Sequence, residues 1–313
     1  YEVRKNVSAK VVAAELAHLN IVSNARLFYW YGRLTGRSEK IKAADYKFLT
    51  SMRPNAVYSI LLSGISYAEP ITVPEGHNIY QIAELLEQYR KGLKNEFLKL
   101  CLNPQTLTKL GFRHAYLLGN LEGYLFPETY LLGRKTTALE IIQQMVKNYK
   151  NAFTPELRER ARELGYSEHQ VITLASIIEK ETGAPEERPV ISSVFHNRLQ
   201  KKMKLQSDPT VIYGIRNFDG NIRRKDLTSN TPYNTYMISG LPPGPIANPG
   251  KAAILAALYP MHSKYFYFVS KNDGTHRFSI TFQEHLKNVS AYQLDKRARE
   301  GKSWRDLGRK KTN

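Results

Sequence analysis

The chain has 313 residues, enough for about two or three domains with a substantial core. Its 46 Lys and Arg against 28 Asp and Glu give a net charge of +18, which favours an anionic partner such as an acidic polymer, a nucleic acid or a membrane surface. A generally basic proteome would give the same balance. The single cysteine, Cys101, excludes an intrachain disulfide and a cysteine-based metal site.

The first 69 residues are predicted to form a small α+β module. Helical spacing of apolar residues predicts one helix within 9–22, and a second helix is predicted over 24–36, ending at a glycine. The segment 45–52 is expected to be a strand before Pro54. A domain boundary is placed near residue 70.

Residues 70–160 are predicted to form a mostly helical linking part of a larger catalytic region. Pro70, Pro74 and Gly76 punctuate a short extended stretch at its start. Helical patterns rich in surface charge follow over 79–101 and 137–165.

A helix with a clear start opens the predicted core, residues 161–292. Ser167 and Gln170 fit a capping box, and the stretch ends in "ASIIEKETG", with Glu179 and Glu181 around Lys180. At about 100° per residue, the two glutamates flank the apolar stripe on opposite sides. Either carboxyl therefore fits the edge of a cleft, where partial desolvation would raise its pKa and suit it to general acid catalysis. The alternative is a helix-end glutamate that lies in water or pairs with Arg188, and Glu179 is the one expected to pair with a basic neighbour.

Long loops dominate the rest of this core, after a second helix within 187–203. The loop "LPPGPIANPG" is expected to present backbone amides to a ligand, and nearby tyrosines offer flat apolar faces with polar edges. This mixture suits an uncharged, hydroxyl-rich ligand such as a sugar. Two strands, 265–270 and 276–282, are predicted to form a hairpin, and residues 293–313 to form a basic C-terminal tail.

Other chemistries find little support in the sequence. The eight histidines show no metal-ligand spacing, and His196 and His276 fit structural or surface roles better than metal ligation. A GxSxG elbow and a phosphate-binding loop are both missing, as is any recognisable nucleic-acid-binding module. We therefore expect no metal, no cofactor and no nucleic-acid partner.

Four ordered blocks over residues 71–292 strongly resemble the YceG-like endolytic murein transglycosylase family. They are "LEGYLFPETY", "LASIIEKETG" with the helix and "LQSDPTVIYG" after it, "PYNTYMISGLPPGPIANPG", and "YFYFVSKNDGTHRFSITFQEH". The first module resembles the LysM-like peptidoglycan-binding unit of that family, although Ala44 stands where a glycine is expected. The resemblance thus implies an α+β fold, a LysM-like module followed by a mixed helical and β catalytic domain with a lytic transglycosylase cleft.

The resemblance also implies a reaction. Members cleave the bond between N-acetylmuramic acid and N-acetylglucosamine of nascent peptidoglycan strands without adding water, which leaves a 1,6-anhydro end and is expected to terminate elongation. The second glutamate of the EKE block, Glu181, corresponds to the family's catalytic acid, which the helical periodicity did not separate from Glu179. A hydrolytic muramidase and a non-catalytic peptidoglycan-binding scaffold are the alternatives.

Further residues of the blocks are candidates for contact with the glycan. They are Glu122, Gln206, Asp208, Tyr213, Asn234 and Tyr236. Two of them have structural alternatives, since Glu122 would also cap the turn at Gly123 and an aspartate before proline is a common turn residue.

The same resemblance implies a cellular setting. Members are held in the inner or plasma membrane by one N-terminal helix, with the catalytic part on the periplasmic or extracytoplasmic side, and work with elongation enzymes such as penicillin-binding proteins. This chain starts at Tyr1 and not at methionine, so we expect it to be the trimmed, soluble part of such a protein.

Overall fold

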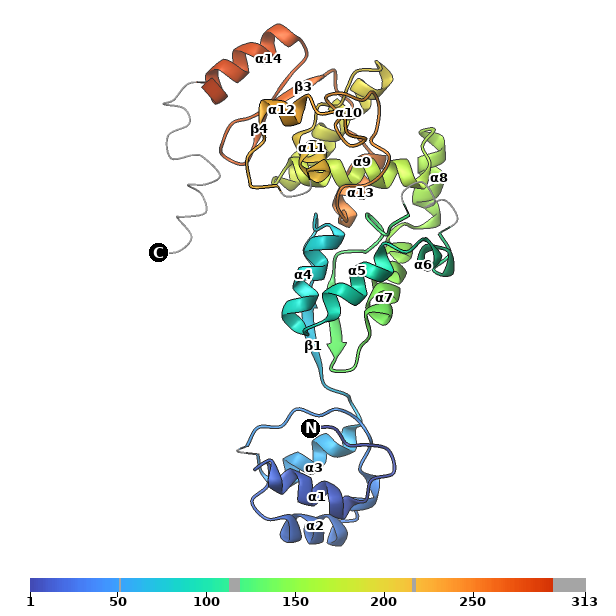
Figure 1. Cartoon of the computed structure of the whole chain (residues 1–313), viewed down its shortest axis with the longest axis vertical. Coiled ribbons are helices and arrows are strands. Elements are labelled where there is room, and N and C mark those ends of the chain that lie inside the picture. The colour runs from blue at the N-terminus through green and yellow to red at the C-terminus, as the bar shows by residue number, and fades with distance from the viewer. Residues whose placement is uncertain (51, 113–118, 216–217, 295–313) are drawn as a thin grey trace. The chain divides into compact units, whose positions relative to one another are not determined.

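The computed structural model describes residues 1–50, 52–112, 119–215 and 218–294, and the description below is limited to them. The chain divides into two compact units (Figure 1). The first comprises residues 1–71 together with 129–137, and the second comprises 72–128 and 138–313. The helices and the two small sheets confirm the predicted α+β class.

Three helices form the core of the first unit, and both helices predicted there are confirmed. They are α1 (Ala9–His18), α2 (Ala25–Leu34) and α3 (Pro54–Ser63), with a short 3-10 turn, η1 (Ser38–Lys40), between the last two. Phe28 stacks on Tyr58 with ring centroids 4.3 Å apart. Gly32 is needed beside this pair, because a Cβ there would lie 1.9 Å from the Tyr58 hydroxyl oxygen. The helices are thereby locked through an aromatic cluster that excludes a larger side chain on α2.

The strand predicted over 45–52 is wrong. Only an isolated antiparallel bridge joins Asp45 to Glu2, and residue 51 lies outside the described residues. The hydroxyl of buried Tyr46 donates to the carbonyls of Lys42 (2.9 Å) and Leu61 (3.0 Å). Since side-chain packing and these bonds hold the segment, its aromatic residues reflect a small core and not a ladder.

A two-stranded sheet pairs β1 (Ala68–Thr72) with β2 (Thr129–Gly133). Residues 129–137 thereby belong to the first unit although they come from the middle of the chain. The sequence pattern identified the extended stretch near residue 70 but gave no indication of its partner strand.

Helices make up most of the second unit. The predicted pattern over 79–101 is two helices, because Gly92 interrupts it in the left-handed region (φ 92°). The helices before α9 in this unit are α4 (Ile79–Tyr89), α5 (Leu93–Cys101), α6 (Pro104–Lys109), α7 (Ala138–Ala152) and α8 (Pro155–Glu163).

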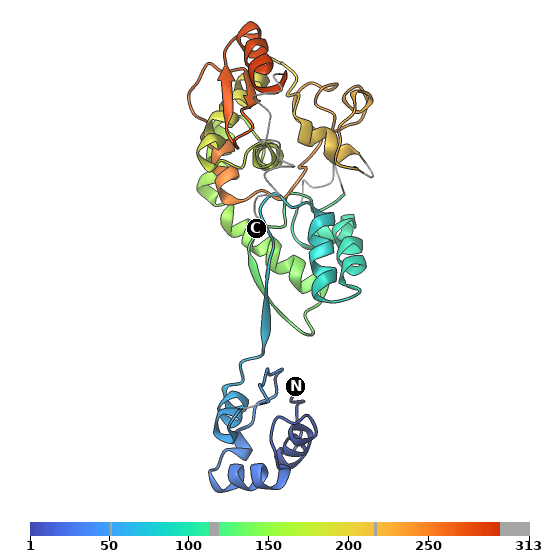
Figure 2. The same cartoon turned by 90° about the vertical axis from the view of Figure 1, so that its left-hand side faces the viewer.

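The helix that carries "ASIIEKETG" is α9 (Glu168–Glu181), and its predicted capping box between Ser167 and Gln170 is confirmed. Figures 1 and 2 show α9 running through the interior of the unit, end-on in Figure 2. It packs against α8, α11 (Asp208–Gly214), α13 (Lys251–Leu258) and the predicted second helix, α10 (Arg188–Gln200). All eight residues from 171 to 178 are buried, so α9 has no solvent face over this middle stretch, and Lys180 is exposed near its end.

The predicted hairpin is confirmed as β3 (Tyr267–Ser270) and β4 (His276–Ser279), antiparallel with Tyr267 opposite Ser279. Two short turns, η3 (Pro185–Glu187) and α12 (Arg224–Leu227), lie earlier in the unit, and α14 (Phe282–Val289) and the π-helical η4 (Ser290–Leu294) follow the hairpin. Most of the predicted tail, from residue 295 on, lies outside the described residues. Within the described part, no helix is both long enough and apolar enough to cross a membrane.

Candidate active site

Glu181 is the last residue of α9, and the chain turns away at Thr182 into extended backbone (φ −138°, ψ 140°). The preceding apolar turns are fully buried, whereas the Glu181 side chain is partly exposed. The buried helix therefore fixes the position of the Glu181 carboxyl, which lies at the edge of the unit. Rigid placement of this kind suits a group that must meet a substrate atom precisely.

Ser207 is the hydrogen-bond partner of Glu181, and its hydroxyl donates to Oε1. Ser207 is itself buried, and its backbone N–H donates to the Thr235 hydroxyl over 3.0 Å. The Thr210 hydroxyl in turn donates to the Ser207 carbonyl over 2.7 Å. Gln206, just before, adopts the left-handed conformation (φ 52°), which a non-glycine residue takes only when its surroundings hold it there. The turn thus fixes the serine hydroxyl toward the glutamate.

The surroundings of Glu181 raise its pKa from 4.5 to about 7, chiefly because burial penalises the ionised form. The Ser207 hydrogen bond opposes this increase, Asp208 adds to it by repulsion, and the Arg198 guanidinium opposes it. A carboxyl with such a pKa holds and releases a proton near neutral pH, which general acid–base catalysis requires.

Arg198, on α10, is a buried cation that acts electrostatically on Glu181. Its Nε donates to the Phe266 carbonyl (2.6 Å) and its Nη1 to the Leu205 carbonyl (2.7 Å). The guanidinium also lies 5.2 Å from the centre of the Tyr267 ring. These bonds fix the segment before Gln206. Arg198 therefore helps to hold the turn at Gln206 and Ser207, and it also places a positive charge near Glu181.

Asp208 and Tyr236 form the polar edge next to this turn. The Tyr236 hydroxyl donates to Asp208 Oδ1 over 2.7 Å, and Asp208 is exposed. Asn234 is fully buried, and its Nδ2 donates to three backbone carbonyls of the loop, those of Asp226, Leu227 and Ser229. Its Oδ1 accepts from the Tyr236 backbone N–H over 3.0 Å, so Asn234 holds the loop that presents Tyr236.

Glu122 forms a second polar centre. It is fully buried, and the Ile79 backbone N–H at the start of α4 donates to both of its carboxyl oxygens at 3.2 Å. The Tyr213 hydroxyl (3.1 Å) and Asn248 Nδ2 (3.0 Å) donate to it as well. Burial raises the pKa of Glu122 to about 8, against these donors. Glu122 therefore connects three segments that are distant in the sequence.

The polar groups around Glu181 and those around Glu122 are joined by α11. Asp208 begins this helix beside the serine turn, and Tyr213, near its other end, reaches Glu122. The ring of Tyr213 packs against Tyr233 with centroids 4.8 Å apart. The predicted candidates thus fall into one group around Glu181 (Gln206, Asp208, Asn234, Tyr236) and one around Glu122 (Tyr213), and whether any of them contacts a glycan stays a prediction.

The expectation that "LPPGPIANPG" presents backbone amides to a ligand is wrong for most of the loop, because residues 244–250 are buried. The Asn248 side chain accepts from the Leu125 N–H (2.9 Å), and its Nδ2 donates to the His77 carbonyl as well as to Glu122. A Cβ at position 250 would lie 1.7 Å from Glu75 Oε1, so a larger residue there would displace the half-exposed Glu75 side chain. The loop ties segments together inside the unit, and its polar groups are used for that purpose.

Glu179 is paired with a basic neighbour, and that alternative is confirmed. Arg188 Nη2 donates to its Oε1 over 2.8 Å, and the Gly250 N–H donates to its Oε2 over 3.0 Å. The side chains of Glu179 and Arg188 are only 5% and 10% exposed. Both Glu179 oxygens are therefore engaged in holding α9, α10 and α13 together, which leaves Glu181 as the carboxyl of the pair at the edge.

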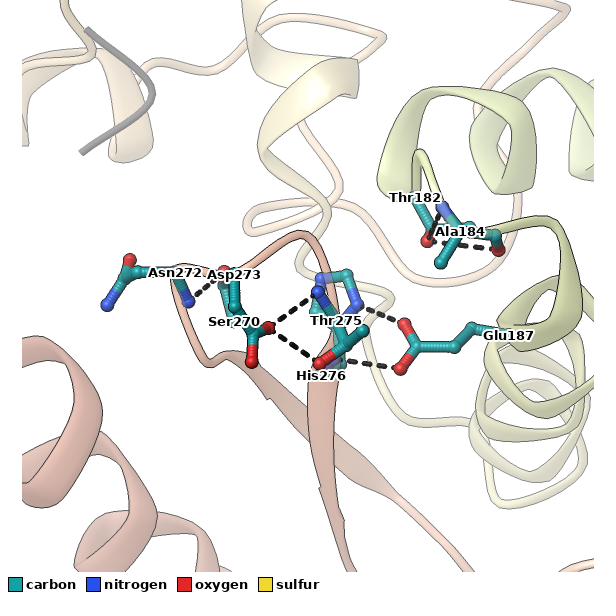
Figure 3. A network of polar contacts seen from close by, with 8 residues as sticks. All are labelled: Thr182, Ala184, Glu187, Ser270, Asn272, Asp273, Thr275 and His276. Carbon is teal, nitrogen blue, oxygen red and sulfur yellow. Dashed lines mark hydrogen bonds and ion pairs between the residues drawn. The ribbon is translucent and has the colours of Figure 1, made fainter. Parts of the chain in front are cut away.

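A polar network pins the segment after α9 to the hairpin (Figure 3). Glu187 accepts from the His276 backbone N–H (2.9 Å) and pairs with its Nδ1 (2.7 Å). Figure 3 also shows Thr182, whose hydroxyl accepts from the Ala184 N–H over 2.9 Å. His276 thus has the structural role that the sequence favoured, and the chain leaving Glu181 has a fixed course.

Comparison with known proteins decides the family. The YceG-like family profile matches residues 1–291. The chain belongs to the YceG-like family.

Named relatives agree with this assignment. The YceG-like chain is 36% identical over 304 residues to the endolytic murein transglycosylase of Bacillus subtilis, an alignment that covers 91% of this chain and 82% of the relative. It is 27% identical to the protein of that name from Streptococcus pneumoniae D39, of which it spans 56%. The crystal structure of a yceG-like protein from Listeria monocytogenes superposes with a TM-score of 0.66 at 33% identity, and covers 91% of this chain and 97% of that one.

Three residues of this YceG-like site were missed in the sequence. Ser207 and Asn248 lie inside the blocks that carry the family resemblance, but serine and asparagine in loops are common turn residues and give no separate signal of a site. Arg198 lies on a helix with Lys201 and Lys202 close by, a pattern that is typical of surface charge. Only the fold shows that Arg198 is buried and that Ser207 faces a carboxyl.

Proposed function

We propose that this chain is a lytic transglycosylase that cleaves peptidoglycan between N-acetylmuramic acid and N-acetylglucosamine and leaves 1,6-anhydro ends. Two of its relatives bear the name endolytic murein transglycosylase. The observation that carries the proposal is the single helix-end carboxyl, Glu181, whose pKa is raised to about 7. A carboxyl that alternates between acid and base roles needs such a value.

In the first step, protonated Glu181 donates its proton to the glycosidic oxygen. The bond from that oxygen to C1 of N-acetylmuramic acid breaks, and the N-acetylglucosamine side leaves with a free 4-hydroxyl. The substrate's own acetamido oxygen stabilises the cationic C1. Glu181 is then ionised, a state that the Ser207 hydroxyl and the Arg198 charge favour.

In the second step, ionised Glu181 takes the proton from the 6-hydroxyl of the same N-acetylmuramic acid while that oxygen bonds to C1. The anhydro ring closes, and the acid form of Glu181 is restored. Because the nucleophile is part of the substrate, proximity replaces the second carboxylate that a hydrolase of the usual kind requires.

We assign Ser207 the role of orienting Glu181 and setting its pKa. Replacing Ser207 by alanine is expected to raise that pKa further, since the hydrogen bond favours the ionised form. The activity loss on the alkaline side should therefore move to higher pH, while the maximal rate falls roughly tenfold or more through the lost charge-assisted bond. A pH profile of peptidoglycan cleavage tests this, with Ser229→Ala on the exposed neighbouring loop as control. An unshifted profile would contradict the role.

Three candidates next to Glu181, two of them exposed and Tyr236 partly exposed, are proposed to meet the glycan directly. Gln206, Asp208 and Tyr236 offer an amide, a carboxylate and an aromatic hydroxyl around one turn, a combination that suits the acetamido and hydroxyl groups of amino sugars. Glu122, Tyr213 and Asn234 are proposed to support that surface from behind, because their polar atoms are directed to other protein groups.

The first unit is proposed to be the LysM-like peptidoglycan-binding module. Two helices lie between chain segments that pair near Glu2 and Asp45, a compact unit of a size suited to such a module. We further propose that the native protein is anchored in the plasma membrane by a preceding helix, acts outside the cytoplasm with elongation enzymes such as penicillin-binding proteins, and terminates strands. The net charge of +18 supports work near anionic wall polymers and lipid.

Product analysis of digested peptidoglycan tests the proposed reaction. Mass spectrometry should find internal cleavage products that end in 1,6-anhydro-N-acetylmuramic acid. Products with reducing ends, heavier by one water, would identify a muramidase instead. Binding of intact peptidoglycan without any product would support the non-catalytic scaffold.

A further inference from the structure

An apolar stripe on α2 of the first unit has no partner among the described residues. Leu27, Trp30 and Leu34 are 71%, 60% and 85% exposed. At about 100° per residue they fall within an arc of about 60° on the helix surface. Three large apolar side chains gathered on one exposed arc are uncommon in a protein that meets only water.

The opposite face of α2 is already used by the core. Phe28 stacks on Tyr58, and Gly32 is packed against the same ring. The stripe is therefore separate from the core-facing side of α2, which carries Phe28 and Gly32.

Positive charge lies along one side of the stripe. Arg26 and Arg33 are exposed next to it on the helix, and Glu39 is the acidic partner of Arg33, at 3.6 Å. The first unit as a whole carries twelve Lys and Arg against five Asp and Glu. A pocket of about 500 Å³ opens beside Leu27 and is lined also by Tyr31 and Arg53.

We propose that α2 docks the first unit on an anionic lipid bilayer, with Leu27, Trp30 and Leu34 inserted at the headgroup level. Leucines offer no hydrogen bonds, so the stripe fits hydrocarbon better than a glycan, and tryptophan is favoured at the membrane interface. Arg26 and Arg33 meet lipid phosphates, and the recess beside Arg53 has room for a headgroup. This contact would hold the unit flat on the membrane surface.

Vesicle binding tests the docking. In a Trp304→Phe background of the whole chain, Trp30 is the only tryptophan. Its fluorescence should shift to the blue with vesicles of phosphatidylcholine containing phosphatidylglycerol and much less with phosphatidylcholine alone. Leu27→Gln with Leu34→Gln should weaken binding at least tenfold. Arg26→Gln should weaken it by about fivefold, and only on anionic vesicles.

Leu49→Gln is the matched control, because Leu49 is a 63% exposed leucine of the same unit that is not part of α2. It should leave vesicle binding unchanged, and thermal melting checks that every variant folds. Equal binding by the double leucine variant, or absence of a Trp30 shift, would overturn the proposal. So would a parallel loss of peptidoglycan binding in the leucine variant, because the stripe would then be a glycan or protein surface.

Discussion

Replacing Glu181 by glutamine is expected to reduce peptidoglycan cleavage by about 10³-fold or more. Glutamine keeps the shape and can still accept the Ser207 hydrogen bond, but it can neither give nor take the proton. One general acid–base group contributes about 10²- to 10⁴-fold, and Glu181 acts in both steps. Quantifying the anhydro products by mass spectrometry measures the effect.

The same variant should be more stable than the wild type above neutral pH. Because the folded protein raises the pKa of Glu181 to about 7, the folded state binds more protons than the unfolded state between about pH 4.5 and 7, and stability falls as pH rises through this range. Removing the charge should raise the melting temperature at pH 8 and change little at pH 4. Loss of activity together with loss of stability would instead indicate damage to the fold.

Glu186→Gln is the matched control for this experiment. Glu186 is exposed on η3, five residues further along the same stretch. It should retain cleavage and stability. Full cleavage by Glu181→Gln would refute the proposed mechanism, even if wild-type products carry anhydro ends.

Breaking the buried Glu179–Arg188 pair is expected to destabilise the second unit by about 3–5 kcal/mol. Arg188→Leu leaves the Glu179 carboxylate buried with only the Gly250 N–H as donor. Glu179→Leu leaves the buried guanidinium with Glu75, 3.9 Å away and half exposed, as its remaining acidic neighbour. Urea denaturation measures the loss, and thermal melting should show a decrease of roughly 10 °C.

The double variant separates the pair interaction from simple loss of packing. With both residues replaced by leucine no buried charge remains unpaired, so the double variant should lose less than the two single variants together. Glu159→Gln removes an exposed pair with Arg162 in the same unit and should cost about 0.5 kcal/mol or less. Additive losses in the double variant would show that the pair does not act as a unit.

Local signals predicted most helices and the hairpin correctly. The capping box at Ser167 and Gln170 marks the start of α9, and "KNDGT" joins two paired strands as expected. These features depend on neighbouring residues only. The strand prediction for 45–52 was wrong because the aromatic residues of this segment pack in a small core. The partner strand of β1 was not predicted, because it lies about 60 residues further along the chain and local patterns do not indicate such pairing.

Tertiary structure decided what the helix containing Glu179 and Glu181 does. The sequence by itself determined that two glutamates end an apolar helix, and the family resemblance selected Glu181. The helical wheel could not separate them, because a helix buried on all sides over 171–178 has no single apolar stripe to measure from. Packing distinguishes the two glutamates physically: Arg188 and Gly250 engage Glu179, whereas burial raises the pKa of Glu181 to about 7 and Ser207 donates a hydrogen bond to it. Such contacts join segments up to 71 residues apart, and only folding brings them together.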